Sequence, residues 1–138
     1  MSNSLETAHQ FIDACETGKG WGFCSKFCHQ DATFSSQTAT LESISSLESY
    51  CEWMKKLLII IPDGKYELKF TVADEERNCL ALLGVIKGTH TVEGGPVPPT
   101  GNSFVADYVY NMEFENGLIS HMTKIWNDTI TLQQLGWL

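Results

Sequence analysis

The residues best suited to chemistry lie near the end of the chain, around His121. An imidazole exchanges protons near neutral pH, and a nearby carboxylate such as Asp107 would hold one tautomer in place and favour its action as a base. Asn127 would donate a hydrogen bond to a developing enolate oxygen. These groups together indicate abstraction of a proton next to a carbonyl, with Asp128 as an alternative acid-base group.

Two predicted strands carry these residues, and alternation of side chains divides each strand into two faces. In residues 103–114 the even positions are aromatic or apolar, whereas the odd positions are mixed. The odd positions of this strand and of the last strand, residues 118–127, supply the polar residues Asp107, Asn111, Glu113, His121 and Asn127. A few polar groups on an apolar wall suit a small-molecule site, although buried polar groups that satisfy one another are the structural alternative.

The segment Cys24–His29 is the place where the sequence suggests a metal site. Cysteines four residues apart share one face of a helix, and a histidine follows them. No second pair of ligands follows downstream, so buried structural thiols are the simpler interpretation. The chain has five cysteines, an odd number that favours reduced thiols, and we expect neither a metal nor a cofactor.

Composition limits the partners. The chain has 138 residues and a formal net charge of −8, without a basic cluster, so we expect neither nucleic acid nor an anionic membrane surface as a partner. The first twenty residues lack the pattern of a secretory signal, and no apolar stretch reaches membrane-spanning length. We therefore expect one cytoplasmic domain over residues 1–138.

The predicted elements fall into two groups. Apolar residues at helical spacing predict three helices, over residues 5–15, 21–28 and 45–58. After Pro62 the period changes from 3.6 to 2, which predicts strands over residues 66–73, 79–91, 103–114 and 118–127. Helices followed by a meander of strands favour an α+β domain in which the helices cover one face of a sheet.

The loop GGPVPPTG, residues 94–101, holds three of the four prolines of the chain. Glycines permit positive φ, and prolines fix φ and remove hydrogen-bond donors, so this loop is predicted to be a stiff connection between two strands. The functional alternative is a preorganised rim over a pocket mouth beside His90.

Several short motifs, in this order and spacing, resemble the SnoaL-like polyketide cyclase family: Gly88-Thr89-His90-Thr91, Pro98-Pro99-Thr100-Gly101, Gly117-Leu118-Ile119 and Gln134-Leu135-Gly136. That family belongs to a superfamily of cone-shaped domains that includes ketosteroid isomerase. The resemblance implies a strongly curved mixed sheet with three N-terminal helices on its concave face. It also implies a cofactor-independent enzyme that acts by proton transfer on a small hydrophobic carbonyl compound. A non-catalytic domain that binds a small ligand is the alternative.

The resemblance places the odd positions of the last strand inside the cone, and there the chain departs from the family pattern. His121 stands where the family often has Glu, Thr123 where it has Trp, and Asn127 where it has the acid-base Asp. Glu113 falls on a position that is often cationic. The expected pocket contains Asp107, His121 and Asn127, has His90 at its mouth, and is walled by Trp21, Tyr50, Trp53 and Met54. If His121 is instead exposed on the convex face, the opposite parity applies and the inner set is Lys124, Trp126 and Asp128.

The even positions would then point outward and form an apolar patch. This patch consists of Tyr108, Tyr110, Met112, Phe114, Met122 and Trp126. Monomers rarely leave such a patch exposed, so the sequence predicts a homodimer through the convex face of the sheet. The alternative is that the C-terminal segment, residues 129–138, folds back and covers the patch within one chain.

Overall fold

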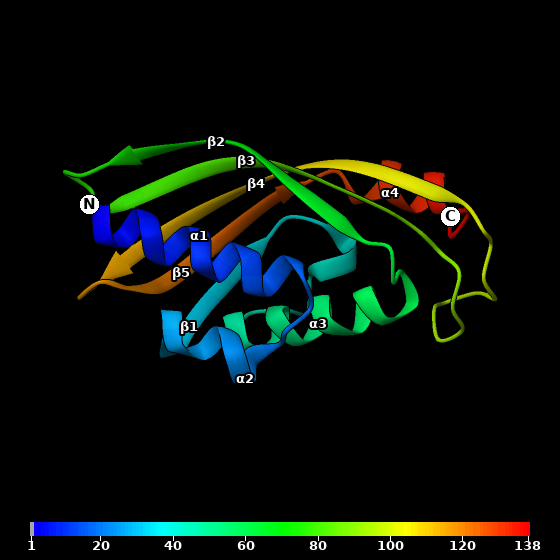
Figure 1. Cartoon of the computed structure of the whole chain (residues 1–138), viewed down its shortest axis with the longest axis horizontal. Coiled ribbons are helices and arrows are strands. Elements are labelled where there is room, and N and C mark those ends of the chain that lie inside the picture. Colours follow the sequence, from blue (N-terminus) through cyan, green and yellow to red (C-terminus); the bar gives the residue numbers. More distant parts are fainter. Residues whose placement is uncertain (1) are drawn as a thin grey trace.

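Five strands form one open, curved sheet in the spatial order β1-β5-β4-β3-β2 (Figure 1). The computed structural model describes residues 2–138. The strands are β1 (Cys28–Ser36), β2 (Lys65–Asp74), β3 (Cys79–Thr89), β4 (Ser103–Glu115) and β5 (Leu118–Trp126). β1 is parallel to β5 and the other pairs are antiparallel, so the sheet is mixed. The predicted α+β fold and the strand meander β2–β5 are confirmed.

Three helices lie under one face of this sheet, and a fourth lies at its end (Figure 1). They are α1 (Ser2–Glu16), α2 (Trp21–Cys24), α3 (Leu47–Ile60) and α4 (Asp128–Leu135). α3 begins where the sequence predicts, because the Ser46 hydroxyl caps it by accepting a hydrogen bond from the Ser49 amide at 3.1 Å. The predicted second helix is shorter than expected, since Cys28 already begins β1. No helix in the described part of the chain is long and apolar enough to cross a bilayer.

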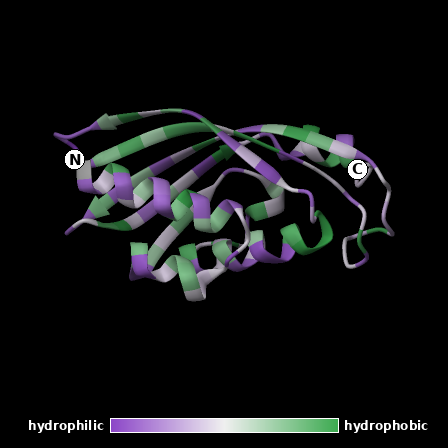
Figure 2. Cartoon of the chain, in the orientation of Figure 1, coloured by the Kyte–Doolittle hydropathy of each residue, from purple (hydrophilic) through white to green (hydrophobic). Residues whose placement is uncertain are grey.

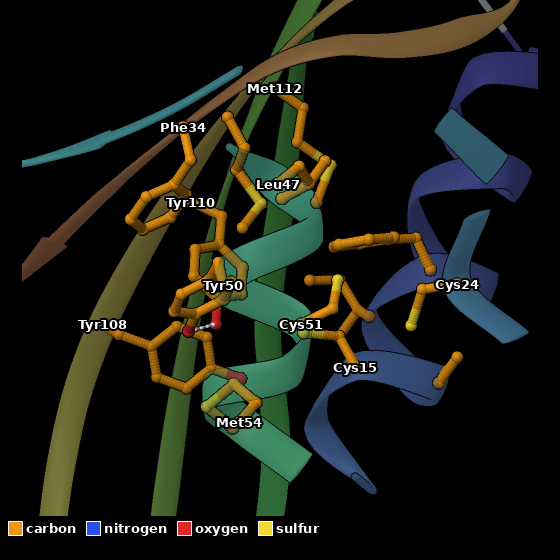
Figure 3. Packing of buried hydrophobic residues seen from close by; sticks show 14 of the residues in the cluster. Cys15, Cys24, Phe34, Leu47, Tyr50, Cys51, Met54, Tyr108, Tyr110 and Met112 are labelled. Atoms are coloured by element: carbon orange, nitrogen blue, oxygen red, sulfur yellow. Dashed lines mark hydrogen bonds between the residues drawn. The ribbon is translucent and has the colours of Figure 1, made fainter. Parts of the chain in front are cut away.

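The core lies between the concave face of the sheet and the helices. Hydrophobic and hydrophilic residues alternate along the strands (Figure 2), and in β4 every even position from Phe104 to Phe114 is buried. Figure 3 shows Tyr108, Tyr110 and Met112 directed from the sheet toward α3. The predicted outward patch is therefore wrong: its residues form the core, and the chain covers them itself.

A β-bulge explains why the predicted faces are inverted on β5. Glu113 pairs with His121 but Phe114 pairs with Ile119, so Ser120 is an extra residue in β5. One extra residue shifts the following side chains to the opposite face. Ile119 points inward at an odd position, and beyond the bulge Met122 and Lys124 point inward at even positions.

The loop between β3 and β4 is fastened at its base by His90. The His90 side chain is fully buried, and its Nδ1 atom accepts a hydrogen bond from the indole of Trp137 at 3.0 Å. Its backbone amide and carbonyl bond to Asn102 and Gly101 on the other side of the loop. The loop needs positive φ at Gly94 (120°) and Gly101 (73°), as the glycines of the sequence suggest.

Candidate functional site

A cavity of about 40 Å³ lies between the sheet, α3 and α4. Its wall is mostly apolar and includes Trp53, Met54, Phe104, Trp126 and Trp137, together with a few polar side chains. Within residues 2–138, Lys124 is the single basic residue of this wall and Glu16 the single acidic one. Both are almost completely buried, with 5% and 2% of their surface exposed.

A chain of hydrogen bonds joins these two charged residues through two tyrosines. The Lys124 ammonium donates to the Tyr50 hydroxyl at 2.9 Å. The Tyr50 and Tyr110 hydroxyls are hydrogen-bonded to each other, and Tyr110 donates to Oε1 of Glu16 at 2.5 Å. Figure 3 shows the two tyrosines meeting between β4 and α3. We call these four residues the relay.

The relay has a direction. A tyrosine hydroxyl has one proton, and that of Tyr110 is donated to Glu16, so Tyr110 accepts from Tyr50. Tyr50 in turn accepts from Lys124. Each group thus donates to the next, and a shift of one proton at each step converts an ion pair at the two ends into a neutral amine and a neutral acid.

Burial shifts the pKa values of Lys124 and Glu16 in the directions that favour their neutral forms. Desolvation lowers the pKa of Lys124 to about 8, although the nearby Glu16 carboxylate acts in the opposite direction. Desolvation likewise raises the pKa of Glu16, with Lys124 and the Tyr110 hydrogen bond opposing it. The pKa values of Tyr50 and Tyr110 are raised by burial and by Glu16, so both remain neutral hydroxyls. Both shifts move the two groups toward the pH range in which general acid–base groups work.

Aromatic rings surround the Lys124 ammonium. It lies 4.4 Å from the ring centre of Trp126 and 5.1 Å from that of Tyr50. Cation–π attraction stabilises the charged form without supplying a competing acceptor. The amine therefore keeps one strong polar partner in the relay, and its other hydrogens face the aromatic wall.

Tyr108 adds an unused hydrogen-bonding group to the cavity. Its side chain lines the cavity, is 1% exposed, and its hydroxyl has no hydrogen-bond partner among the described residues. An unpaired buried hydroxyl costs about 1–3 kcal/mol, which a ligand oxygen would recover. Gly84, opposite Tyr108 on β3, leaves room for this ring, since a Cβ there would lie 2.5 Å from the hydroxyl oxygen.

A surface groove of about 450 Å³ adjoins the cavity. Cavity and groove share Thr40, Trp53, Leu57, Leu132 and Trp137 in their walls. The outer part of the groove is lined by residues 94–96 of the proline-rich loop. The loop thus lies at the rim of the groove, which agrees with the functional alternative for this segment.

The sequence-predicted polar residues lie outside the cavity. Asp107 and Glu113 are exposed on the outer face of β4, Asn111 is half-buried on the same face, and none of them lines the cavity. Asp107 does share an open outer groove with Asn127 and Asp128. The prediction that Asp107, His121 and Asn127 point into one cavity is wrong: the odd positions of β4 face outward, the bulge in β5 turns His121 outward, and Asn127 caps α4.

His121 has hydroxyl partners in place of an acid. Its Nδ1 atom lies 2.6 Å from the Thr33 hydroxyl, and its Nε2 atom lies 3.1 Å from the hydroxyls of Ser35 and Thr123. In residues 2–138 no carboxylate forms an ion pair with it. Glu113 is its cross-strand neighbour in β4, but the two side chains form no ion pair, so no carboxylate fixes the tautomer of His121.

Asn127 and Asp128 stabilise the start of α4. The Asn127 side chain accepts a hydrogen bond from the Ile130 amide at 3.2 Å, as an N-cap residue does. Asp128 accepts from the Thr40 amide at 3.0 Å and from the Thr40 hydroxyl at 2.7 Å. Partial burial opposes ionisation, but the bonds from Thr40 outweigh it and hold the pKa of Asp128 below its ordinary value. Hydrogen bonds that stabilise the fold thus explain the positions of both side chains.

We expect Asp128→Ala to lower the free energy of unfolding by about 1–3 kcal/mol at pH 7, since two hydrogen bonds to a charged group are lost. The folded-state pKa is depressed, so this contribution is complete above about pH 4 and disappears as the pH falls through the folded-state pKa. Urea unfolding at pH 7 and pH 2.5 measures the difference. Asp107→Ala, at an exposed carboxylate of the outer face, is the control and should change little; equal losses would contradict this role.

The predicted pocket walls are partly right. Trp53 and Met54 line the cavity, and Tyr50 is a buried member of the relay. Trp21 does not line the cavity; it lies half-buried beside α3, where its amide bonds to Glu52. His90 is also absent from the cavity wall and supports it indirectly through Trp137.

Sequence reasoning missed Glu16, Tyr108 and Tyr110 as site residues, and it gave Lys124 only within the alternative inner set, of which Lys124 and Trp126 line the cavity and Asp128 does not. Two signals were present. Lys124 alternates with Met122 and Trp126, so a charge occupies an apolar row of a strand. Glu16 follows Ile12 by four residues, which places a carboxylate on the buried stripe of α1.

The cysteines are free thiols, most of them inside the fold. Five free thiols are present, and all but Cys79 are buried. Cys15, Cys24 and Cys51 lie between α1, α2 and α3 (Figure 3). Among the residues that the structure describes, no group of three histidine, cysteine or acidic residues has a geometry that could hold a metal ion.

Known proteins share this architecture. AclR from Streptomyces galilaeus, a provisionally assigned hydroxylase, has a TM-score of 0.80 and 22% identity, covering 100% of this chain and 87% of that chain. IdmH from Streptomyces antibioticus, a provisionally assigned polyketide cyclase, has a TM-score of 0.75 and 20% identity over 96% of this chain and 98% of that chain. At these identities the likeness shows the fold.

A comparison with curated proteins finds none that matches. The family model described as SnoaL-like polyketide cyclase matches residues 6–135, which is nearly the whole chain. The motifs, the curved mixed sheet and this match agree with one another. The chain belongs to the SnoaL-like polyketide cyclase family.

Proposed function

We propose that this protein is a cofactor-independent enzyme that transfers protons on a small hydrophobic carbonyl compound, using the relay of Lys124, Tyr50, Tyr110 and Glu16. The observation that carries this proposal is a lysine and a glutamate buried at the wall of an apolar cavity and joined by two hydroxyls. Buried ion pairs contribute little net stability, because desolvation offsets their attraction. A buried pair with shifted pKa values at a cavity favours a role in chemistry.

The residues suggest a division of work. The unpaired Tyr108 hydroxyl would donate to the carbonyl oxygen of the substrate and stabilise the enolate that forms there. Once the relay has passed the ammonium proton of Lys124 to Glu16, the neutral amine would receive the proton from the adjacent carbon and later return it to the substrate. The apolar wall keeps water away, which strengthens each of these interactions.

Exchange of protons in heavy water tests this proposal without knowledge of the natural substrate. The probe is 2-tetralone, a small hydrophobic ketone whose acidic hydrogens are replaced by deuterium when an enolate forms. We expect the wild-type protein to accelerate the loss of these signals in proton NMR above the rate in buffer. Binding of 2-tetralone without acceleration would favour the alternative, a non-catalytic ligand-binding domain.

We also propose a homodimer through the convex face of the sheet, formed by residues other than the apolar patch that the sequence predicts. Phe70, Leu83, Val109 and Ile125 form one cross-strand row on the outer face from β2 to β5. Phe70 and Ile125 are each more than half exposed, at 58% and 56%. A second copy would cover this row, and about 800 Å² per subunit would make an interface of standard size.

Sedimentation at micromolar concentration should give twice the monomer mass of 15.4 kDa for the wild type. Ile125→Lys should yield the monomer, because a charge would be buried in the interface. Ile59→Lys, at an equally exposed position on α3, should leave the dimer intact. A wild-type species of 15.4 kDa that persists on concentration would rule out this interface.

A further inference from the structure

Lys124 has the surroundings of a nucleophile as well as those of a base. A neutral amine attacks carbonyl carbons, and a lysine becomes neutral near physiological pH when it is desolvated in an apolar site. Lys124 meets that condition, since it lies in the wall of a mostly apolar cavity and is 5% exposed.

The groups that face the amine come from three elements. Glu16 and Cys15 belong to α1, Tyr50 to α3, and Tyr108 and Tyr110 to β4. Of these, Glu16 is the one whose carboxylate favours the ammonium form, and it acts through two hydroxyls rather than by direct contact. The amine is thus free to lose its proton along the relay while remaining beside the cavity.

We propose that Lys124 forms an imine with the carbonyl group of the substrate, an inference that rests on the proposed proton-transfer function. The Nζ lone pair adds to the carbonyl carbon, and the carbonyl oxygen takes up a proton. The resulting neutral carbinolamine takes up one further proton, which the relay returns from Glu16, expels this oxygen as water and leaves a protonated imine. Loss of a proton from the adjacent carbon then gives the enamine, a carbon nucleophile, and addition of water later regenerates the amine and the carbonyl compound.

The other residues of the site supply what these steps need. The Tyr108 hydroxyl, unpaired at the cavity, can donate to the oxygen that leaves. Tyr50 touches the amine and connects it to Glu16, so protons have a route away from and back to the nitrogen.

The substrate class follows from this chemistry. An amine in an apolar cavity selects ketones and aldehydes with hydrophobic substituents, and 1,3-dicarbonyl compounds form the most stable products because the enamine is conjugated. Anionic acids gain less, since Glu16 lies in the same wall.

Acetylacetone is a suitable probe, because a 1,3-diketone and a neutral amine combine with loss of one water to give an enaminone that absorbs in the near ultraviolet. At pH 7 about one in ten amines is neutral when the pKa is about 8, against about one in 2,500 for an ordinary lysine with a pKa near 10.4. We expect one adduct per chain, with the mass of the diketone less one water. It should form on the order of 100-fold faster than adducts of ordinary lysines.

Tryptic mapping of the wild-type adduct identifies the modified lysine without any variant, since a modified Lys124 is no longer a cleavage site. Lys124→Met should lose the absorbing adduct, whereas Lys87→Met, at an exposed lysine of β3, should retain it. Adducts on exposed lysines alone would overturn the imine proposal. If 2-tetralone exchange persists in that case, proton transfer by the relay still stands; absence of both adduct and exchange would overturn both.

Discussion

Lys124→Met is expected to reduce the 2-tetralone exchange rate to that of buffer, a loss of about 100-fold to 10,000-fold for removal of an acid-base group. Methionine has a similar length and is apolar, so it fills the space beside Trp126 and leaves the cavity wall in place. It also removes the need to bury an ammonium group, although the Glu16 carboxyl loses its cationic partner. The initial rate of deuterium uptake measures the effect.

His121→Ala is the matched control for this experiment. His121 lies on the same strand as Lys124 but on its outer face, where it is hydrogen-bonded to hydroxyls of β1 and β5. Its removal should leave the exchange rate within about twofold, because surface substitutions rarely change the folded structure. If His121→Ala abolishes exchange while Lys124→Met retains it, the relay is not the site of proton transfer.

Gly84→Val is expected to lower the free energy of unfolding by about 3 kcal/mol and to abolish binding of 2-tetralone. Gly84 is on the inner face of β3, directly opposite Tyr108 on β4. A Cβ at Gly84 would overlap the end of the Tyr108 ring, with 2.5 Å to the hydroxyl oxygen. The ring is 1% exposed and must move toward the cavity, which removes both packing and space for a ligand. Urea unfolding and a thermal-shift titration with 2-tetralone measure the two effects.

Two further variants show whether this loss comes from the Tyr108 ring. Gly84→Val combined with Tyr108→Leu should be less destabilised than the sum of the two single variants, because the shorter side chain relieves the overlap. Gly22→Ala, at a glycine of α2 with no atom within 4 Å of the added Cβ, should be neutral or slightly stabilising. If the losses of unfolding free energy of Gly84→Val and Tyr108→Leu add strictly in the double variant, the proposed overlap between residue 84 and the Tyr108 ring is contradicted.

Periodicity predicted most of the helices and strands, because local patterns determine them, whereas the curved mixed sheet was implied by the family resemblance. Ser46 as a cap, the change of period after Pro62 and the glycines of the β3–β4 loop all act within a few residues. α4 was not predicted, since its cap Asn127 was interpreted as a pocket residue. The burial of α4 depends on a contact with Thr40, which is distant in sequence, and on a contact with the indole of Trp126, which forms only when β5 and α4 are folded together.

The site was predicted on the wrong face, for a physical reason. The family resemblance placed all odd positions of the last strand inside the cone. This holds for Ile119, but a bulge at Ser120 separates Ile119 from His121. A bulge has no strong sequence signal here, and it inverts every later position of the strand. The apolar even face of β4 was the better guide, since a row of buried aromatics belongs to the core. Lys124, a charged residue in the corresponding buried row of β5, was the sequence feature that indicated the site.

The central claim is that Lys124 and Glu16 share a proton inside the fold, and NMR titration of the lysine side chains tests it most directly. In protein labelled at the lysine side chains, one signal should titrate at about pH 8 and vanish in Lys124→Met. Glu16→Gln removes the carboxylate that favours the ammonium form, so the pKa of Lys124 should fall below about 8. A spectrum in which no lysine titrates near pH 8, or in which Glu16→Gln leaves that titration unchanged, would contradict the account.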